Sequence, residues 1–303
     1  MRQNKPPFVA TRYRHIIFPG EAMKPQPVDI GMYSSGGAGF IEPASKLSGE
    51  NAELLEWLFA QAGLNVNLYR VETLKRRLPA CLRALRVRST SEARRQIEQD
   101  HSLIPVALDT MLVGVTWFFR DAAVFDMLRD AVLPSLVEGR KNLYVWSVGC
   151  SDGAELYSVA LLLSEMGALG NSYLLGTDCR AEAIARCRQS RYNADALKYV
   201  PASLIERYFD RLPGGWQIVS GIRSATRWRI ANVLQGAEPG IWDLILCRNT
   251  GMYLRAEAMN RLWEQFEMHL RPGGVLVLGK AERPVGTKRF SFVAPCIYRR
   301  KRG

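Results

Sequence analysis

A glycine turn that carries carboxylates is the part of this 303-residue sequence whose residue types and spacing best suit chemistry. Gly149 and Gly153 shape the turn, and Asp152 and Glu155 stand in it and just after it. A turn that binds phosphate offers bare backbone N–H groups and often a cation. This turn has no lysine or arginine, so its acids favour a ligand with positive charge and hydroxyl groups.

A third acid, Asp178, ends the next predicted strand. In doubly wound nucleotide folds, an acid at this position accepts hydrogen bonds from the ribose hydroxyls of the ligand. The alternative is that Asp178 only caps the helix that follows. S-adenosylmethionine (SAM) combines a sulfonium, an amino group and a ribose without a phosphate, so it fits these acids better than NAD or ATP does.

The elements around these acids predict an α/β fold with a parallel sheet. Residues 143–148 are apolar and rich in Val, Tyr and Trp, as in a buried parallel strand, and a helical pattern follows the turn. Further strands are predicted at 172–178, 228–233, 242–247 and 275–278, with a closing hairpin at 290–293 and 297–299. A terminal antiparallel hairpin is typical of the Rossmann-like fold of SAM-dependent methyltransferases. Ligands of such sheets bind outside the carboxyl ends of the strands, so Asn232 and Asn249 should join Asp178 at the site.

The rest of the chain divides by composition and periodicity. We expect a flexible leader over 1–47, a small all-helical domain over 48–112, a helical connector over 113–140 and the SAM-binding domain over 141–303. Residues 192–226 are less regular and are interpreted as a small inserted β-subdomain. Within the helical domain, the helix predicted at 71–85 is strongly basic.

Net charge is +12 and the pI is near 9.6, which favours an acidic partner. A nucleic-acid methyltransferase is one reading of this charge, but the chain lacks an Asn-Pro-Pro-Tyr-type motif at 249–253 and an aromatic-rich basic stripe, so we expect no nucleic-acid partner. No apolar run approaches the ~20 residues of a membrane span, and no signal peptide is evident, so we expect a cytoplasmic protein without membrane insertion. The six cysteines form no CxxC pair, which predicts no metal site. Three of them, Cys150, Cys179 and Cys247, fall at strand ends near the ligand, and we interpret them as apolar filler rather than as nucleophiles.

Taken together, these residues resemble the CheR family of chemotaxis receptor methyltransferases, which transfer a methyl group from SAM to receptor glutamates. The resemblance extends from about residue 48 to the C-terminus. It rests on RRLPACLRAL (76–85), TWFFRDAAVF (116–125), WSVGCSDGAELYS (146–158), Asp178, Arg207-Tyr208-Phe209, Asn232, CRNTGMYL (247–254), RPGG (271–274) with LGKAE (278–282), and Tyr298.

The resemblance implies a role for each matching residue. SAM would be bound by the glycine turn at Gly149 and by Thr116, Arg120, Glu155, Asp178, Asn232, Val233 and Asn249. Arg120 and Tyr253 would hold the substrate carboxylate, as catalytic residues of a protein-glutamate O-methyltransferase. The basic helix Arg76–Arg86 would face a chemoreceptor-like helical substrate. Some members grip a receptor C-terminal peptide with the inserted subdomain, but the loop after Tyr208-Phe209 is short here, so we expect no such tether.

The chemistry is consistent with these roles. A glutamate is ionised at neutral pH, so the enzyme needs no general base and has only to align the reacting atoms and remove water. Arg120 could clamp a carboxylate with its forked donors, although an ordinary surface arginine is the alternative.

The departures from the family pattern that fall in the pocket include Gly114 in place of an asparagine, Ala154 in place of an acid and Lys280 in place of a histidine. These departures keep a second hypothesis open, a catalytically degenerate methyltransferase-fold regulator that binds a signalling partner.

Overall fold

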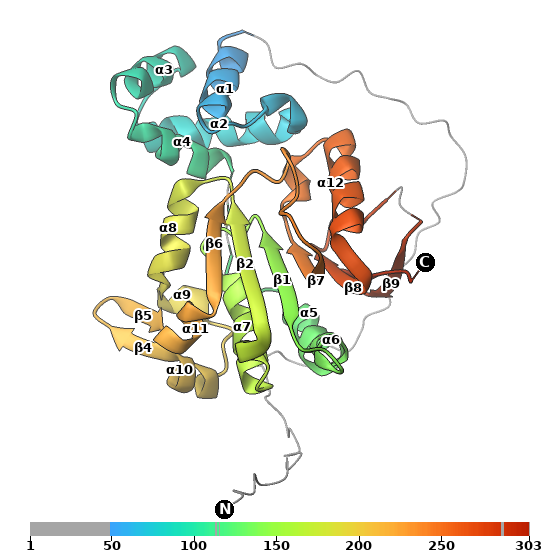
Figure 1. Ribbon diagram of the computed structural model, residues 1–303. Coiled ribbons are helices and arrows are strands. Elements are labelled where there is room, and N and C mark those ends of the chain that lie inside the picture. The colour runs from blue at the N-terminus through green and yellow to red at the C-terminus, as the bar shows by residue number, and fades with distance from the viewer. Residues whose placement is uncertain (1–48, 113, 115, 286–287, 303) are drawn as a thin grey trace, which may run out of the picture.

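The computed structural model describes residues 49–112, 114, 116–285 and 288–302 (Figure 1). Its largest element is a seven-stranded sheet with the strand order β6-β2-β1-β7-β8-β10-β9. The first five strands of that order are parallel, and β10 pairs antiparallel with both β8 and β9. The strands are β1 Leu143–Val148, β2 Ser172–Asp178, β6 Thr226–Ile230, β7 Trp242–Cys247, β8 Leu270–Leu278, β9 Phe290–Ala294 and β10 Ile297–Arg300. The predicted α/β fold with a C-terminal antiparallel hairpin is confirmed.

Successive residues of the strands face two different cores. In β1, Val145 packs in the core shared with α5, α6 and α7, whereas Trp146 packs in the core shared with α12 and the N-terminal helices. Because both faces are covered, β1 is buried except at Tyr144 and reads as a continuous apolar run. The helices of this part are α5 Ala122–Met127, α6 Leu133–Val137, α7 Ala154–Glu165, α8 Ala181–Gln189 and α12 Ala256–His269, and the π-helical turn Leu128–Val132 joins α5 to α6.

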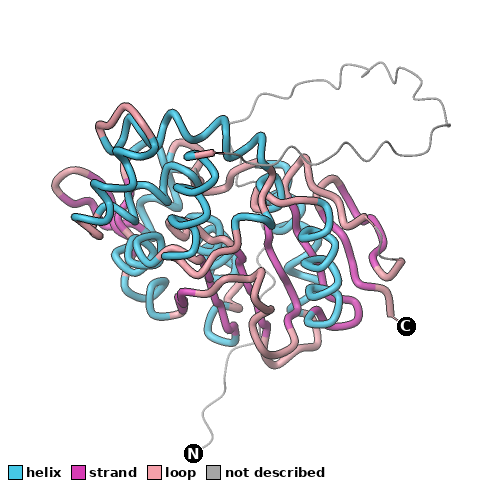
Figure 2. Tube along the Cα trace, turned by 90° about the horizontal axis from the view of Figure 1, so that it is seen from above, coloured by secondary structure: helices cyan, strands magenta, loops and turns pink. Residues whose placement is uncertain are grey.

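The N-terminal helices of the described chain are α1 Glu50–Gln61, α2 Val71–Leu85, α3 Thr90–Gln99 and α4 Leu103–Met111. They lie beyond the arrowheads of β1, β2 and β6 (Figure 1), and Figure 2 views the molecule from that side. Arg70 fixes the start of α2, because its backbone N donates to the carbonyl of Tyr253 (2.8 Å) and its Nε to that of Leu254 (2.7 Å). The N-terminal helices are therefore attached to the loop that follows β7.

A second, three-stranded sheet stands apart from the large one, with the strand order β3-β5-β4 and antiparallel pairing. Its elements are β3 Arg191–Tyr192, α9 Ala194–Leu197, α10 Ala202–Tyr208, β4 Phe209–Leu212, β5 Gly215–Ile218 and α11 Ser220–Ser224. Only Pro213 and Gly214 connect β4 to β5. This small sheet begins at Arg191, one residue before the predicted insertion 192–226, and its other residues lie within that range.

The predicted helix at 71–85 and strand at 143–148 are confirmed with their bounds. The strand predicted at 228–233 is observed two to three residues earlier, at Thr226–Ile230, because β6 ends where its partner β2 ends, with Ile230 opposite Asp178. Asn232 therefore follows the strand rather than lying in it. The predicted leader 1–47 lies outside the described residues, and the domain boundaries stay a prediction. Among the helices described, none is both long and apolar enough to cross a membrane.

Candidate functional site

One cavity lies between the carboxyl ends of β1, β2 and β7 and the N-terminal helices, since residues of both line it. All nine residues predicted for the site line this single cavity: Thr116, Arg120, Gly149, Glu155, Asp178, Asn232, Val233, Asn249 and Tyr253. The parallel topology accounts for this convergence, because it brings the ends of distant strands to the same edge of the sheet.

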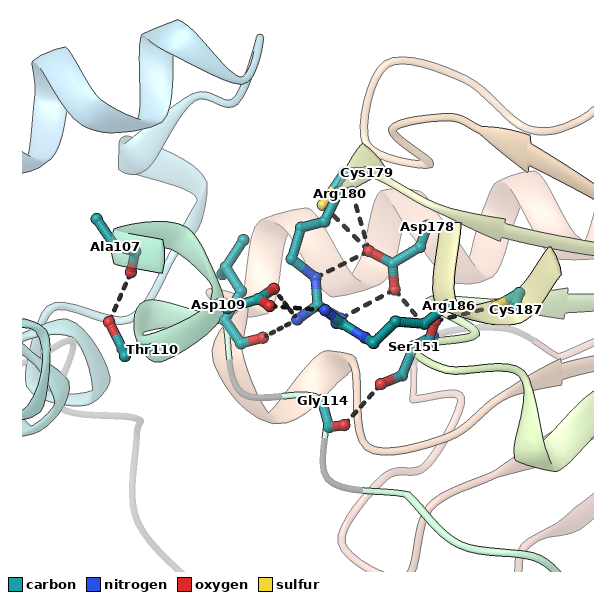
Figure 3. A network of polar contacts seen from close by, with 11 residues as sticks. Ala107, Asp109, Thr110, Gly114, Ser151, Asp178, Cys179, Arg180, Arg186 and Cys187 are labelled. Carbon is teal, nitrogen blue, oxygen red and sulfur yellow. Dashed lines mark hydrogen bonds and ion pairs between the residues drawn. The ribbon is translucent and has the colours of Figure 1, made fainter. Parts of the chain in front are cut away.

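Asp178, the predicted ribose-binding acid, is held by four N–H donors (Figure 3). Its Oδ1 accepts hydrogen bonds from the backbone N and the Nε of Arg180, both at 3.0 Å. Its Oδ2 accepts from the backbone N of Ser151 (3.0 Å) and from Nη2 of Arg180 (3.2 Å). Arg180 is itself buried, and the neighbouring carboxylates raise the pKa of its guanidinium despite the desolvation that opposes charge. Asp178 thus lies in the site as half of a buried ion pair.

Arg180 also joins the sheet to the N-terminal helices. Its Nη1 donates to Oδ1 of Asp109 in α4 (3.0 Å) and to the carbonyl of Leu112 (2.9 Å). The second oxygen of Asp109 accepts from Nη1 of Arg186 in α8 (3.0 Å). Figure 3 shows this continuous chain of contacts from α4 to the end of β2.

Gly114, one of the departures that the resemblance implies, makes room for this network. A Cβ at position 114 would lie 2.4 Å from Oγ of Ser151 and 2.6 Å from Nη2 of Arg180. The same glycine accepts a hydrogen bond from Ser151 Oγ through its carbonyl (2.6 Å). The absent side chain at 114 and the buried Arg180 therefore belong to one arrangement.

Glu155, the other predicted SAM-binding acid, begins a second chain of charges. Its Oε1 accepts from Ser147 Oγ (3.0 Å), and its Oε2 pairs with Arg248 (3.2 Å). Arg248 also pairs with Asp121 (2.6 Å), which in turn pairs with Lys280 (2.8 Å). Burial opposes ionisation of Asp121, but the bond to Lys280 and the charges of Arg248 and Lys280 outweigh it and lower its pKa. Lys280, another of the departures that the resemblance implies, thus neutralises an acid next to Arg120.

The loop that presents Arg120 has an unusual backbone. Both neighbours of Arg120, Phe119 and Asp121, have positive φ angles, 53° and 63°. This conformation is unfavourable for residues other than glycine and persists where the surroundings enforce it. Here Phe119 N donates to Ser158 Oγ (3.0 Å), and Arg248 Nη2 donates to the carbonyl of Arg120 (2.8 Å).

Glu282 organises the loop that carries Asn249 and Tyr253. Its buried carboxylate accepts hydrogen bonds from the backbone N of Gly279 (2.7 Å), Asn249 (3.0 Å) and Gly251 (2.7 Å). Burial raises the pKa of Glu282, and these N–H groups offset part of that rise. The bonds fix the course of the chain after β7, and with it the 3₁₀ turn Gly251–Tyr253.

Four arginines line the cavity, against two carboxylates. Arg180 and Arg248 are paired with Asp178 and Glu155. Arg77, from the basic helix α2, has no ion pair in the part of the chain that the structure describes, and its enclosed Nε lacks a hydrogen-bond partner there. The cavity therefore carries surplus positive charge, which suits an anionic substrate.

Thiol chemistry is not supported at this site. Cys150 and Cys179 line the cavity, but burial raises the pKa of Cys150 well above its usual range and that of Cys179 to about 12. A thiol is a nucleophile as its thiolate, so both are inert at neutral pH. Within the described residues, no cluster of His, Cys, Asp and Glu could hold a metal ion.

The residues that line the cavity fit SAM. Asp178 and Glu155 supply hydrogen-bond acceptors for hydroxyl and amino groups. Gly149 has a left-handed backbone, with φ 63°, and no side chain that would block the turn. A Cβ there would lie 2.6 Å from Oγ1 of Thr250, another residue of the cavity lining.

Sequence reasoning did not assign a role to Arg180, Arg248 or Glu282. Two signals were present, since Arg248 and Glu282 lie within the motifs CRNTGMYL and LGKAE. Arg180 carried no signal, because only the fold brings it against Asp109.

Comparison with known proteins agrees with this geometry. A family model described as "CheR methyltransferase, SAM binding domain" matches residues 114–296. "Chemotaxis protein methyltransferase 1" of Pseudomonas aeruginosa is 31% identical over 208 residues, which cover 65% of this chain and 76% of the relative. The "Chemotaxis protein methyltransferase" of Listeria innocua is 28% identical over 222 residues (73% and 85%), and that of Borreliella burgdorferi 24% over 265 residues (83% and 94%). Since the family model spans more than half of its residues, the chain belongs to the CheR methyltransferase family.

Proposed function

We propose that this protein is a protein-glutamate O-methyltransferase, which transfers the methyl group of SAM to glutamate side chains of a chemoreceptor-like protein. One observation carries the proposal: a single cavity combines the acids suited to SAM with arginines in excess of them. The names of the relatives, chemotaxis protein methyltransferases, are consistent with it.

The residues divide into two groups by task. Asp178 and Glu155 would hold SAM, whose sulfonium supplies an electrophilic methyl group. Arg120 would hold the substrate carboxylate through paired N–H donors, and Tyr253 would orient it. The substrate glutamate is already ionised, so these residues act by alignment and exclusion of water rather than by moving a proton.

The test is transfer of labelled methyl groups from SAM to a receptor cytoplasmic fragment, released again by base as an ester. Arg120→Ala should abolish transfer, whereas Arg120→Lys should retain a small part, because lysine keeps the charge without the fork. If isothermal titration finds SAM binding while no receptor fragment is methylated, the regulator hypothesis replaces this one.

The surface of α2 supports a receptor-binding role for the segment Arg76–Arg86. Arg76, Arg83 and Arg86 are exposed, while Arg77 on the same helix lines the cavity. A helix that reaches from the solvent to the site could guide an acidic substrate to it. Arg83→Glu should raise the KM for the receptor fragment, and Arg95→Glu on the exposed face of α3 serves as the matched control.

We also propose that the protein does not bind a receptor C-terminal peptide. The β4–β5 hairpin has a connection of only two residues, Pro213 and Gly214, and presents little surface to a peptide. Titration with the C-terminal peptide of the receptor should give no heat, and removal of that peptide should leave the rate of methylation unchanged. Binding in the micromolar range would contradict this.

A further inference from the structure

Two cations lie over one indole ring beside the proposed catalytic arginine. Cζ of Arg120 is 4.9 Å and Nζ of Lys198 is 4.7 Å from the centroid of the Trp117 ring. Lys198 also lies 5.0 Å from the ring of Tyr199, and the two rings are 6.2 Å apart. These four residues, Trp117, Arg120, Lys198 and Tyr199, are termed the cation–aromatic cluster.

The cluster joins two parts of the chain that are fixed to each other. Trp117 and Arg120 precede α5, whereas Lys198 and Tyr199 follow α9 in the small subdomain. Next to Trp117, the backbone N of Phe118 donates to the carbonyl of Ala196 (3.1 Å), and the buried ring of Phe118 packs against Tyr192 at 4.8 Å. Lys198 is therefore held near Arg120 by the fold.

Lys198 differs from the neighbouring cations in its ion pairing. Among the residues that the structure describes, no carboxylate forms an ion pair with Lys198, whereas Lys280 pairs with Asp121 and both Arg180 and Arg248 pair with acids. Arg120 and Lys198 lie 4.9 Å and 4.7 Å from the centroid of the Trp117 ring, so their charges are within about 10 Å of each other. This distance is close to the screening length at physiological ionic strength. An anion bound between or beside them would be attracted by both charges.

An anion from outside can reach this place. Lys198 is exposed, and 39% of the surface of Tyr199 is accessible to solvent. Arg120 also lines the catalytic cavity, so the cluster begins at the substrate end of the site and extends outward from it.

We propose that the cation–aromatic cluster is a second anion subsite, which binds an acidic side chain of the polypeptide substrate next to the glutamate that is methylated. The inference rests on the proposed function, because it takes Arg120 to hold the reacting carboxylate. On a helical substrate, side chains three or four residues apart share a face, with Cβ atoms about 5–6 Å apart. An Asp or Glu at that spacing from the methylated glutamate would reach Lys198 while the glutamate is held by Arg120.

The expected effect is on substrate binding rather than on the chemical step. Exposed ion pairs change an equilibrium constant by up to about fivefold. Loss of Lys198 or of the flanking acid should therefore raise KM by about three- to fivefold, with kcat within about twofold of its original value.

The experiment uses the full chain and a receptor cytoplasmic fragment whose methylated glutamate has been located by mass spectrometry. Acidic residues three or four positions from that glutamate are changed to Gln or Lys, one at a time. Each fragment is assayed with the wild type, with Lys198→Glu and with the matched control Lys141→Glu, an exposed lysine away from the cavity.

We expect Lys198→Glu to raise KM on the native fragment and to lower it on the fragment with a flanking lysine, while Lys141→Glu follows the wild type. Equal KM values for Lys198→Glu and Lys141→Glu on all fragments would overturn the inference and leave the proposed function intact. Absence of methyl transfer by the wild type to every fragment would overturn the proposed function, and the inference with it.

Discussion

Substitution of Gly114 by alanine should destabilise both the fold and the cofactor site, because the new Cβ would lie too close to two side chains. The new Cβ would lie 2.4 Å from Ser151 Oγ and 2.6 Å from Arg180 Nη2, so both atoms have to move. Ser151 would then lose its hydrogen bond to the carbonyl of residue 114, and Arg180 would lose the one to Oδ2 of Asp178.

The magnitude follows from those two bonds. A neutral hydrogen bond contributes about 0.5–1.5 kcal/mol and one between charged groups about 1.5–3 kcal/mol. Loss of both predicts a decrease of about 2–4 kcal/mol in the free energy of unfolding. The affinity for S-adenosylhomocysteine should fall by about tenfold or more, because Asp178 loses part of its support.

Urea denaturation and isothermal titration measure the two quantities, and a double-mutant cycle assigns them. In the background of Ser151→Ala or Arg180→Gln, the clash is partly removed, so Gly114→Ala should cost at least 1 kcal/mol less, about the size of one such bond. Gly170→Ala is the matched control, since a Cβ there meets nothing within 4 Å. Equal stabilities of Gly114→Ala and Gly170→Ala, or strict additivity in both cycles, would refute the reasoning.

Three further predictions concern the same site. Glu282→Gln should lower kcat/KM by about tenfold or more and the free energy of unfolding by about 1–3 kcal/mol, because an amide cannot accept all three backbone N–H bonds that fix the loop of Asn249; wild-type activity would contradict it. Burial raises the pKa of Asp152 to about 6. The folded state then binds more protons than the unfolded one between about pH 4 and 6, so stability falls as pH rises through that window. Asp152→Asn, which keeps the acceptor for the Ala154 backbone N, should remove this decrease and be about 1–3 kcal/mol more stable at pH 7, with no difference at pH 4 in denaturation curves. Tyr253→Phe should lower kcat on the receptor fragment by about tenfold while SAM binding by titration stays within about twofold, and an equal loss of both would assign Tyr253 to the cofactor.

Much of this site could be predicted from the sequence because a parallel sheet brings the carboxyl ends of its strands to one edge, where the ligand binds. The sequence predicts Asp178 and Asn249 at the ligand site because each lies at the end of an apolar run or just after one, and both residues line the cavity. This rule does not predict contacts between side chains that come from separate elements. Arg180 lies two residues after Asp178, yet its partner Asp109 is 71 positions away in a helix of another part of the chain.

The local pattern of the turn does not predict its ion-pair partners. The glycine turn itself has no lysine or arginine, and its acids favour a ligand with positive charge. In the folded protein, Arg180 and Arg248 approach the acids from other elements and occupy them. The separation of these partners along the sequence made them hard to predict. Of the three acids named from the sequence, Glu155 and Asp178 line the cavity, whereas Asp152 does not.

The pairing of acids with arginines bears on how the cofactor is held. A carboxylate has about four acceptor positions, and Asp178 already accepts four N–H donors, three of them from Arg180. A ribose hydroxyl can bind there by sharing an oxygen of Asp178 with Arg180, which keeps the carboxylate in place. Arg180 keeps its bonds to Asp109 and the carbonyl of Leu112 when the oxygen is shared, and it therefore stays beside the ligand. These same bonds attach α4 to the sheet, so Arg180 takes part both in holding Asp178 in place and in docking the N-terminal helices.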